Sequence, residues 1–301
     1  MTFVRPFSLE TPVSSTRLLD DVAAVNLPRQ FGLLEKAVEV ISGSDAVHSL
    51  HVRGSLATGT ADRLSDLDFI VAVHDPSFGP FIRIIDTLMS AELGAILPGW
   101  RDTIVARMGG LGYVFLVPHE GKLHQIDLYA VPVSRLDTVL ARTKAMPVYQ
   151  SEGQHTQRHS QVDWLINSTL ERPYTGQELL VEILVLGHMI RKRITRGQRY
   201  VAYAEMFALH TATKNLIKTA LAPGSAFYGW YQLAEEIGAT PIGRQCLADL
   251  DRLISGHPIP AANDLTAALS TALDVADRAA PDAVAGLRTA ISAYWQYLEL
   301  M

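Results

Sequence analysis

The sequence predicts an α+β protein, with a mixed β-sheet in its N-terminal half and an all-helical C-terminal half. The chain has 301 residues, of which 48% are hydrophobic and 19% are charged. This is enough apolar material for a core, and it excludes a disordered or fibrous protein. Helical and extended spacings of apolar residues alternate in the first half, and only helical spacing follows in the second. A polar stretch at 142–160 separates the halves, so we expect domains at 1–150 and 151–301.

The elements of the first half follow from its apolar spacing. A helix is expected over 27–41, where a Ser-Gly-Ser breaker follows, and another over 81–93. Alternating or continuous runs of apolar residues predict strands, and they lie at 47–52, 67–73, 103–108, 113–117 and 123–131. A loop is expected at 94–100. Two strands, a helix and further strands predict a small mixed sheet with helices packed on it.

The second half contains helix signals only. Thr175 and Glu178 form a capping-box pattern, in which each side chain can bind the other residue's backbone N–H. A helix should therefore run from there to about Thr195, where Gly197 interrupts it. Further helices are expected at 199–221, 228–237 and 241–254, and across alanine-rich sequence at 262–298.

Charge and cysteine content exclude several classes of protein. The chain has 26 Lys and Arg against 31 Asp and Glu, a net charge of −5 divided almost evenly between the halves. Neither half is therefore expected to hold a long nucleic acid. A single cysteine excludes disulfides and cysteine zinc sites and favours a reducing compartment, so we expect a cytoplasmic protein. The sequence shows neither a signal-peptide pattern nor a membrane-spanning segment, and we expect no membrane partner.

One segment carries candidate chemistry. Gly54-Ser55 leaves a predicted strand, and ten residues separate it from Asp66-Leu67-Asp68, which opens the next strand. Because side chains alternate along a strand, Asp66 and Asp68 should project on the same side. Paired carboxylates are hard oxygen ligands that suit Mg²⁺. Gly54 permits close backbone approach, and Ser55 with the following amides can hold phosphate oxygens.

A third carboxylate lies inside a later apolar strand. Burying Asp127 there is costly unless it binds a cation or accepts hydrogen bonds. With Asp66 and Asp68 it would form a triad on neighbouring strands. Such a two-metal site lowers the pKa of an attacking hydroxyl and stabilises a leaving pyrophosphate.

Simpler roles remain open for these acids. Asp66 and Asp68 could be a solvated pair at a strand start or part of a turn cap at Ser65. Asp127 could pair with Arg101 or Arg107 of a neighbouring strand.

The spacing of Gly54-Ser55, Asp66-Leu67-Asp68 and the later Asp127 resembles the nucleotidyltransferase superfamily that includes DNA polymerase beta. In detail, GSLATGTADRLSDLDFIVAV is similar to the aminoglycoside and lincosamide nucleotidyltransferases. The resemblance covers about 47–131. It implies a catalytic domain at 1–150 followed by a helical domain at 151–301. One departure is Arg53, because the family usually has an apolar or aromatic residue before this glycine; we expect Arg53 not to touch the metal ligands.

The activity that this resemblance implies is Mg²⁺-dependent transfer of a nucleoside monophosphate from a nucleoside triphosphate, with ATP the expected donor. The acceptor would be a hydroxyl of a small molecule such as an antibiotic. Asp66, Asp68 and Asp127 would be the metal ligands, and Asp127 could instead be the base that accepts the hydroxyl proton. Gly54 and Ser55 would hold the donor phosphates.

Other residues could complete this site. Arg63 could bind phosphate or lie on the surface. Lys214 and Lys218 share a helix face, and in related transferases a lysine on a helix reaches the donor phosphates. Glu205 lies on a different face, and a base role for it is a carry-over from such enzymes. Five basic residues could meet an anionic substrate or complement a helix C-terminus: Arg191, Lys192, Arg193, Arg196 and Arg199.

Two rival functions remain. The acceptor could be a protein side chain or the 3′ end of an RNA, although the even negative charge counts against RNA. The chain could also be a catalytically silent nucleotide-binding protein. The three acids count against this, because an abandoned catalytic site usually loses at least one of its ligands.

Overall fold

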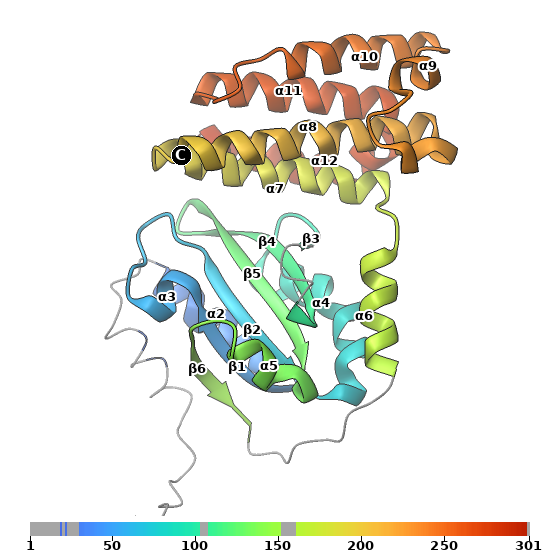
Figure 1. Ribbon diagram of the computed structural model, residues 1–301. Helices are drawn as coiled ribbons and strands as arrows, with labels where there is room; N and C mark the ends of the chain where they lie inside the picture. The colour runs from blue at the N-terminus through green and yellow to red at the C-terminus, as the bar shows by residue number, and fades with distance from the viewer. Residues whose placement is uncertain (1–18, 20–21, 23–29, 103–107, 152–160, 300–301) are drawn as a thin grey trace, which may run out of the picture. The chain divides into compact units, whose positions relative to one another are not determined.

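The computed structural model describes residues 19, 22, 30–102, 108–151 and 161–299. The strand expected at 103–108 therefore falls almost entirely outside the described residues. Contacts divide the chain into two compact units (Figure 1). The first comprises residues 1–93, 102–113 and 125–170, and the second comprises 94–101, 114–124 and 171–301.

A six-stranded mixed sheet confirms the predicted α+β class. The order of its strands is β3-β4-β5-β2-β1-β6. β2 runs parallel to β5, whereas β1 is antiparallel to both β2 and β6. The strands are β1 (Val47–Arg53), β2 (Leu67–Val73), β3 (Trp100–Asp102), β4 (Leu111–His119), β5 (Lys122–Pro132) and β6 (Ala145–Gln150).

Local sequence explains the central strands. β2 is a run of β-branched and aromatic residues, and all but one of its side chains are buried, as expected of a strand in the middle of a sheet. β4 and β5 are joined by Glu120 and Gly121, which have φ values of 49° and 73°. Positive φ at both positions is what a two-residue hairpin turn requires.

Helices pack on the first unit's part of the sheet (Figure 1). On one side lie α2 (Phe31–Ser42) and α4 (Phe78–Leu93), and short α3 (Gly54–Thr58) follows β1 directly. Tyr129 and Val131 of β5 pack with residues of α5 (Leu136–Leu140), so α5 covers the opposite sheet face.

The polar stretch at 142–160, where the domain boundary is expected, instead contains β6, and α6 (Gln161–Glu171) follows the stretch directly. β6 is an edge strand that buries only Val148, and α6 buries only Val162 and Ile166. So few apolar positions do not produce a recognisable period. The first unit accordingly extends to Leu170 rather than to residue 150.

The second unit is built from the helices that the sequence predicts, except that the helix expected at 228–237 is α-helical only over 233–237. The capping box is confirmed: the Glu178 N–H donates to Thr175 Oγ1 at 3.2 Å, and the Thr175 N–H donates to Glu178 Oε2 at 2.8 Å. The helices are α7 (Gly176–Thr195), α8 (Arg199–Leu221), α9 (Leu233–Ile237), α10 (Pro241–Ile254), α11 (Ala262–Ala279) and α12 (Pro281–Glu299). No helix among the described residues is long and apolar enough to cross a membrane.

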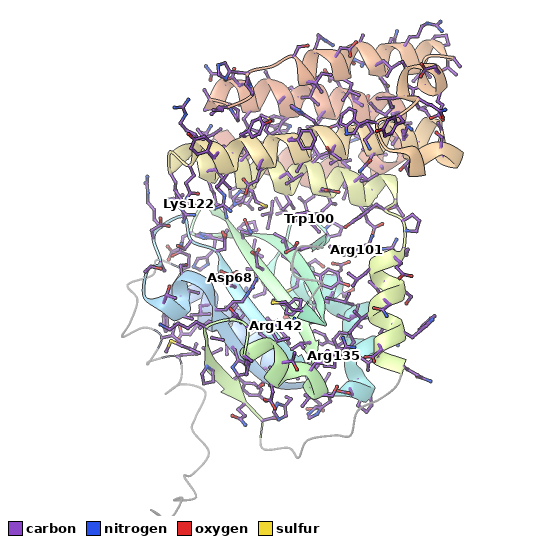
Figure 2. All side chains as sticks on the ribbon, viewed as in Figure 1. Asp68, Trp100, Arg101, Lys122, Arg135 and Arg142 are labelled. Carbon is purple, nitrogen blue, oxygen red and sulfur yellow. The ribbon has the colours of Figure 1, made fainter. Side chains whose placement is uncertain are left out.

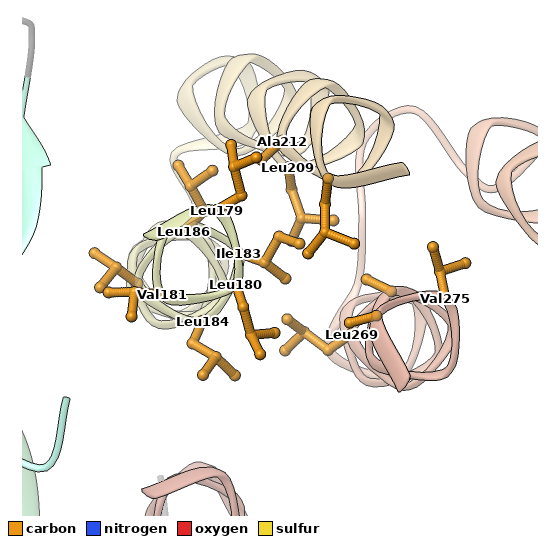
Figure 3. Close-up of a cluster of buried hydrophobic side chains, with 14 of the residues drawn as sticks. Leu179, Leu180, Val181, Ile183, Leu184, Leu186, Leu209, Ala212, Leu269 and Val275 are labelled. Atoms are coloured by element: carbon orange, nitrogen blue, oxygen red, sulfur yellow. The ribbon is translucent and has the colours of Figure 1, made fainter. Parts of the chain in front are cut away.

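Helix α7 is the centre of the second unit's core. Its apolar side chains point in several directions, and they pack with Leu209 and Ala212 of α8 and with Leu269 of α11 (Figure 3). A helix that is apolar on most sides needs neighbours on most sides. Leu116 and Leu123 of the β4–β5 hairpin belong to the same cluster, as do Leu97, Trp100 and Val114. The second unit therefore contains hairpin residues from the first half of the sequence, which a single cut at residue 150 could not provide.

Packing around Gly187 of α7 yields a stability prediction. A Cβ there would lie 2.6 Å from the Tyr294 hydroxyl and 2.7 Å from Leu269 Cδ2. We expect Gly187→Ala to lower the free energy of unfolding by about 1–3 kcal/mol through overpacking. Gly286→Ala on exposed α12, where a Cβ meets nothing within 4 Å, should raise it by about 0.5–1 kcal/mol. Urea unfolding measures both, and equal effects would contradict the packing described for α7.

Candidate functional site

Two of the three predicted acids lie side by side in the sheet. Asp68 of β2 pairs in register with Asp127 of β5, and the two strands are parallel. Neighbouring strands lie about 4.8 Å apart, and residues paired in register project to the same face. Asp68 and Ile70 are two residues apart on β2, so their side chains lie on the same face of the sheet. Ile70 belongs to the cluster that includes α5, and both acids therefore lie on the face that α5 covers. Figure 2 shows Asp68 on its strand beside α3.

The carboxylate of Asp68 lies between the Arg53 guanidinium and the backbone of Gly54. Arg53 Nη2 lies 3.4 Å from Asp68 Oδ1, with 17% of the Arg53 side chain and 21% of the Asp68 side chain exposed. A Cβ on Gly54 would lie only 2.5 Å from Asp68 Oδ2, and Gly54 has a φ of +65°. The expectation that Arg53 does not touch the ligands is therefore wrong. Antiparallel pairing of Val52 with Phe69 brings the end of β1 to the start of β2.

Asp127 is held by a residue that the sequence analysis missed. The Gln125 side-chain amide donates to Asp127 Oδ1 at 2.6 Å, and Gln125 is buried. The signal was available, because residues two apart on a strand share a face. This bond is one way to offset the cost of placing a carboxylate in an apolar strand.

The loop between the two motif halves is internally bonded. Thr58 Oγ1 donates to the Gly54 carbonyl at 3.1 Å, and Asp62 Oδ1 accepts the Leu64 N–H at 2.9 Å. The side-chain amide of buried Gln30, also missed from sequence, donates to the carbonyls of Asp62 and Ser65 at 3.2 Å each. Gln30 thereby fixes the segment that leads into Asp66.

Two residues of this segment that are predicted to bind phosphate, Ser55 and Arg63, have polar side-chain groups available for it. The Ser55 hydroxyl makes no hydrogen bond within the described residues, and the exposed Arg63 guanidinium makes no ion pair there. Asp66 lies directly before β2 and is partly buried. The structure thus brings Gly54, the first residue of α3, together with Asp68 and Asp127 of the sheet, and Ser55 follows Gly54 in α3.

The donor set matches a hard divalent cation, because its side-chain ligands are carboxylate oxygens. Within the described residues, however, no three His, Cys, Asp or Glu side chains are gathered as a metal cluster. The two paired acids have local partners: Asp68 faces Arg53 and Gly54, and Asp127 accepts a hydrogen bond from Gln125. The chemistry of the acids fits Mg²⁺, while their carboxylates are bonded to protein groups.

The lysines predicted to bind phosphate have partners within the second unit. Lys218 Nζ lies 3.3 Å from the Ser225 carbonyl, 3.0 Å from the Tyr231 carbonyl and 3.2 Å from Glu236 Oε2. These three oxygens match the three N–H donors of an ammonium group. Its predicted phosphate contact stays a prediction, and its observed partners give it a structural role.

Lys214 is also buried in the second unit. Its ammonium bonds to the Asn215 side chain and lies 5.3 Å from the centre of the Trp230 ring. Burial and the nearby Lys218 charge lower the pKa of Lys214. A phosphate contact by Lys214 likewise stays a prediction.

The basic run at the end of α7 is not a uniform solvent-facing surface. Lys192 is 2% exposed. Arg193 Nε donates to Glu205 Oε1 at 3.0 Å, which joins α7 to α8. Glu205 is thus an ion-pair partner between two helices, and a base role for it stays a prediction.

Sequence reasoning also missed Glu182 of α7. Burial raises the pKa of Glu182 to about 7, against the lowering effect of the nearby Arg101 charge. The Arg101 guanidinium lies 4.1 Å from the centre of the Tyr174 ring, and its Nη2 donates to the Arg172 carbonyl at 2.8 Å. An acid at helical spacing gives no sign of such burial, which only the packing around α7 produces.

Comparison with known proteins found no matching family model and no matching curated protein. Function therefore has to be argued from the site itself.

The contact between Gly54 and Asp68 is testable with a matched pair of glycines. Gly54 and Gly94 both have positive φ, +65° and +75°, but a Cβ on Gly94 meets nothing within 4 Å. Alanine should cost about 1 kcal/mol at each position because of the left-handed backbone. Gly54→Ala should cost a further 1–3 kcal/mol or so, since it displaces the Asp68 carboxylate. Equal losses of unfolding free energy for Gly54→Ala and Gly94→Ala in urea would show that the Gly54 backbone does not contact the Asp68 carboxylate.

The pKa of Glu182 yields a pH prediction. Its ordinary value is 4.5, so the folded state binds the proton more tightly than the unfolded state between pH 4.5 and about 7. The stability that it contributes is present below pH 4.5 and is lost as the pH rises through 7. Glu182→Gln should flatten this part of the stability profile and raise stability above pH 7. An unchanged profile in unfolding experiments from pH 4 to 8 would contradict the burial of this carboxyl.

Proposed function

We propose that the chain is a Mg²⁺-dependent nucleotidyltransferase that moves a nucleoside monophosphate from a nucleoside triphosphate, with ATP the expected donor, to a hydroxyl of a small molecule. One observation carries this proposal. Asp68 and Asp127 are paired in register on parallel strands, and the Gly54 backbone lies against the Asp68 carboxylate. Two acids beside a glycine-serine turn form a site with oxygen ligands for a metal and close backbone access for phosphates.

In the proposed reaction the acceptor oxygen forms a bond to the α-phosphorus, the bond from that phosphorus to the bridging oxygen breaks, and pyrophosphate leaves. The hydroxyl proton passes to Asp127, or to solvent where Asp127 is a metal ligand. Mg²⁺ held by Asp66, Asp68 and Asp127 would supply positive charge for the phosphates and lower the pKa of the hydroxyl.

The chain's own groups would position the donor. Gly54 lets phosphate oxygens approach the backbone, and the Ser55 hydroxyl donates to them. Asp127 contributes either as a metal ligand or as the base that takes the hydroxyl proton. The Gln125 amide orients this carboxylate through its 2.6 Å bond.

The nature of the acceptor is open to direct assay. The net charge of −5 gives no support for a long RNA acceptor. We propose a small hydroxyl compound, such as an antibiotic of the aminoglycoside or lincosamide kind. Transfer to a protein side chain or to an RNA 3′ end is the alternative outcome of the same assay.

We predict that Asp68→Asn and Asp127→Asn each lower kcat/KM at least about 100-fold, because each removes charge from the metal ligands. The assay follows transfer of an α-labelled nucleotide to a small-molecule panel, to total RNA and to protein. Asp45→Asn, on the exposed turn before β1, is the control and should keep wild-type activity. Circular dichroism checks folding. Near-native turnover in either site variant would overturn the proposal, and binding of triphosphate without transfer to any acceptor would favour the silent protein.

A further inference from the structure

Arg53 is the residue of the candidate site that neither the motif nor the proposed function uses. It ends β1, directly before Gly54, and its guanidinium lies 3.4 Å from Asp68 Oδ1. Only 17% of its side chain is exposed. An arginine stays charged at every physiological pH, so this is a resident cation on a proposed metal ligand.

The arginine is only partly satisfied by this contact. Its Nε is buried and has no hydrogen-bond partner within the described residues. A buried N–H without a partner lowers the stability of the fold by about as much as a lost hydrogen bond. An acceptor oxygen placed at the Arg53 Nε would therefore be bound favourably. The 3.4 Å separation from Asp68 is also longer than a strong charge-assisted hydrogen bond, which is about 2.8 Å.

Arg53 is one of three arginines whose charges act on the Tyr129 hydroxyl. Burial raises the pKa of Tyr129 to about 12, and the charges of Arg53, Arg135 and Arg142 act in the opposite direction. Arg135 and Arg142 lie in the same unit as Asp68 (Figure 2). A guanidinium beside a pair of carboxylates suits a ligand that brings both a cation and an anion, such as a metal–triphosphate complex.

We propose that Arg53 is the counter-ion of Asp68 when no metal is bound, and that it transfers to a phosphate oxygen of the donor when metal and triphosphate arrive together. This inference rests on the proposed function. In the absence of triphosphate, the guanidinium competes with a divalent cation for the same carboxylate and weakens metal binding. Triphosphate removes that competition, because its oxygens take over Arg53, including the unpartnered Nε. Binding of metal and triphosphate is therefore positively coupled.

The experiment measures binding rather than turnover. Isothermal titration with MgCl₂, and with MnCl₂ followed by electron paramagnetic resonance, gives metal affinity without nucleotide. Arg53→Gln and Arg53→Met remove the charge, and Lys36→Gln on the exposed face of α2 is the control. Because the charge removed lies 3.4 Å from a ligand oxygen, both Arg53 variants should bind metal about tenfold more tightly than wild type. The control should not change.

A second titration uses a non-hydrolysable triphosphate in EDTA and then with Mg²⁺. Wild type should show tighter metal binding in the presence of triphosphate, and the Arg53 variants should lose most of that enhancement and bind metal-free triphosphate about tenfold more weakly. Arg53→Lys, which keeps the charge but lacks the Nε donor, should bind metal alone as wild type does and should lose only part of that enhancement. Thermal unfolding confirms that each variant is folded. Arg53→Gln and Arg53→Met both remove the charge, so if one does not fold, the other still provides the test.

Unchanged or weaker metal binding in the neutral variants would overturn the inference. If Asp68→Asn also abolishes metal binding in that case, the proposed function survives and Arg53 is a structural partner. If wild type binds no divalent metal with or without triphosphate, both the inference and the proposed function fail.

Discussion

The candidate site depends on the parallel, in-register pairing of β2 with β5. That pairing brings Asp68 and Asp127 together although 58 residues lie between them in the sequence. Antiparallel pairing of β1 with β2 then delivers the end of β1 to the start of β2, so that Gly54 lies against Asp68. A shift of one residue in the β2–β5 register would turn one acid to the other face of the sheet and remove the site.

Two carboxylates on adjacent strands repel each other, and the structure offsets this locally. Arg53 provides a charge for Asp68, and Gln125 provides a hydrogen bond for Asp127. These partners keep the two acids in place, and no three acids are gathered into a metal cluster among the described residues. If the site binds a metal as proposed, that metal has to displace or reorient these contacts, so Arg53 would matter to binding as much as the proposed ligands.

The second unit has a central helix, α7, that determines which charged residues are buried. Its core surrounds α7, so charged residues that fall on this helix or beside it become buried and must find partners there. Lys218 bonds to three oxygens, and Arg193 pairs with Glu205. Residues that look like ligands by type and helical spacing thus acquire structural roles, because an unpaired buried charge is far more costly than an exposed one. Glu182 takes another course, in which burial raises its pKa instead.

The sequence by itself determined the α+β class, the order of the main elements, the helical second half and the acids of the motif. These rest on local rules: apolar periodicity, the Thr175–Glu178 capping box and the alternation of side chains along strands. It could not reveal β6 or α6, whose few buried residues leave no period, nor the hairpin residues in the second unit. Only the tertiary structure decided that Asp68 pairs with Asp127, that Arg53 and Gln125 are their partners, and that Lys218 is bound by carbonyls. The physical reason is that strand register and burial are properties of the whole packed chain, whereas the sequence pattern records only which face each residue prefers.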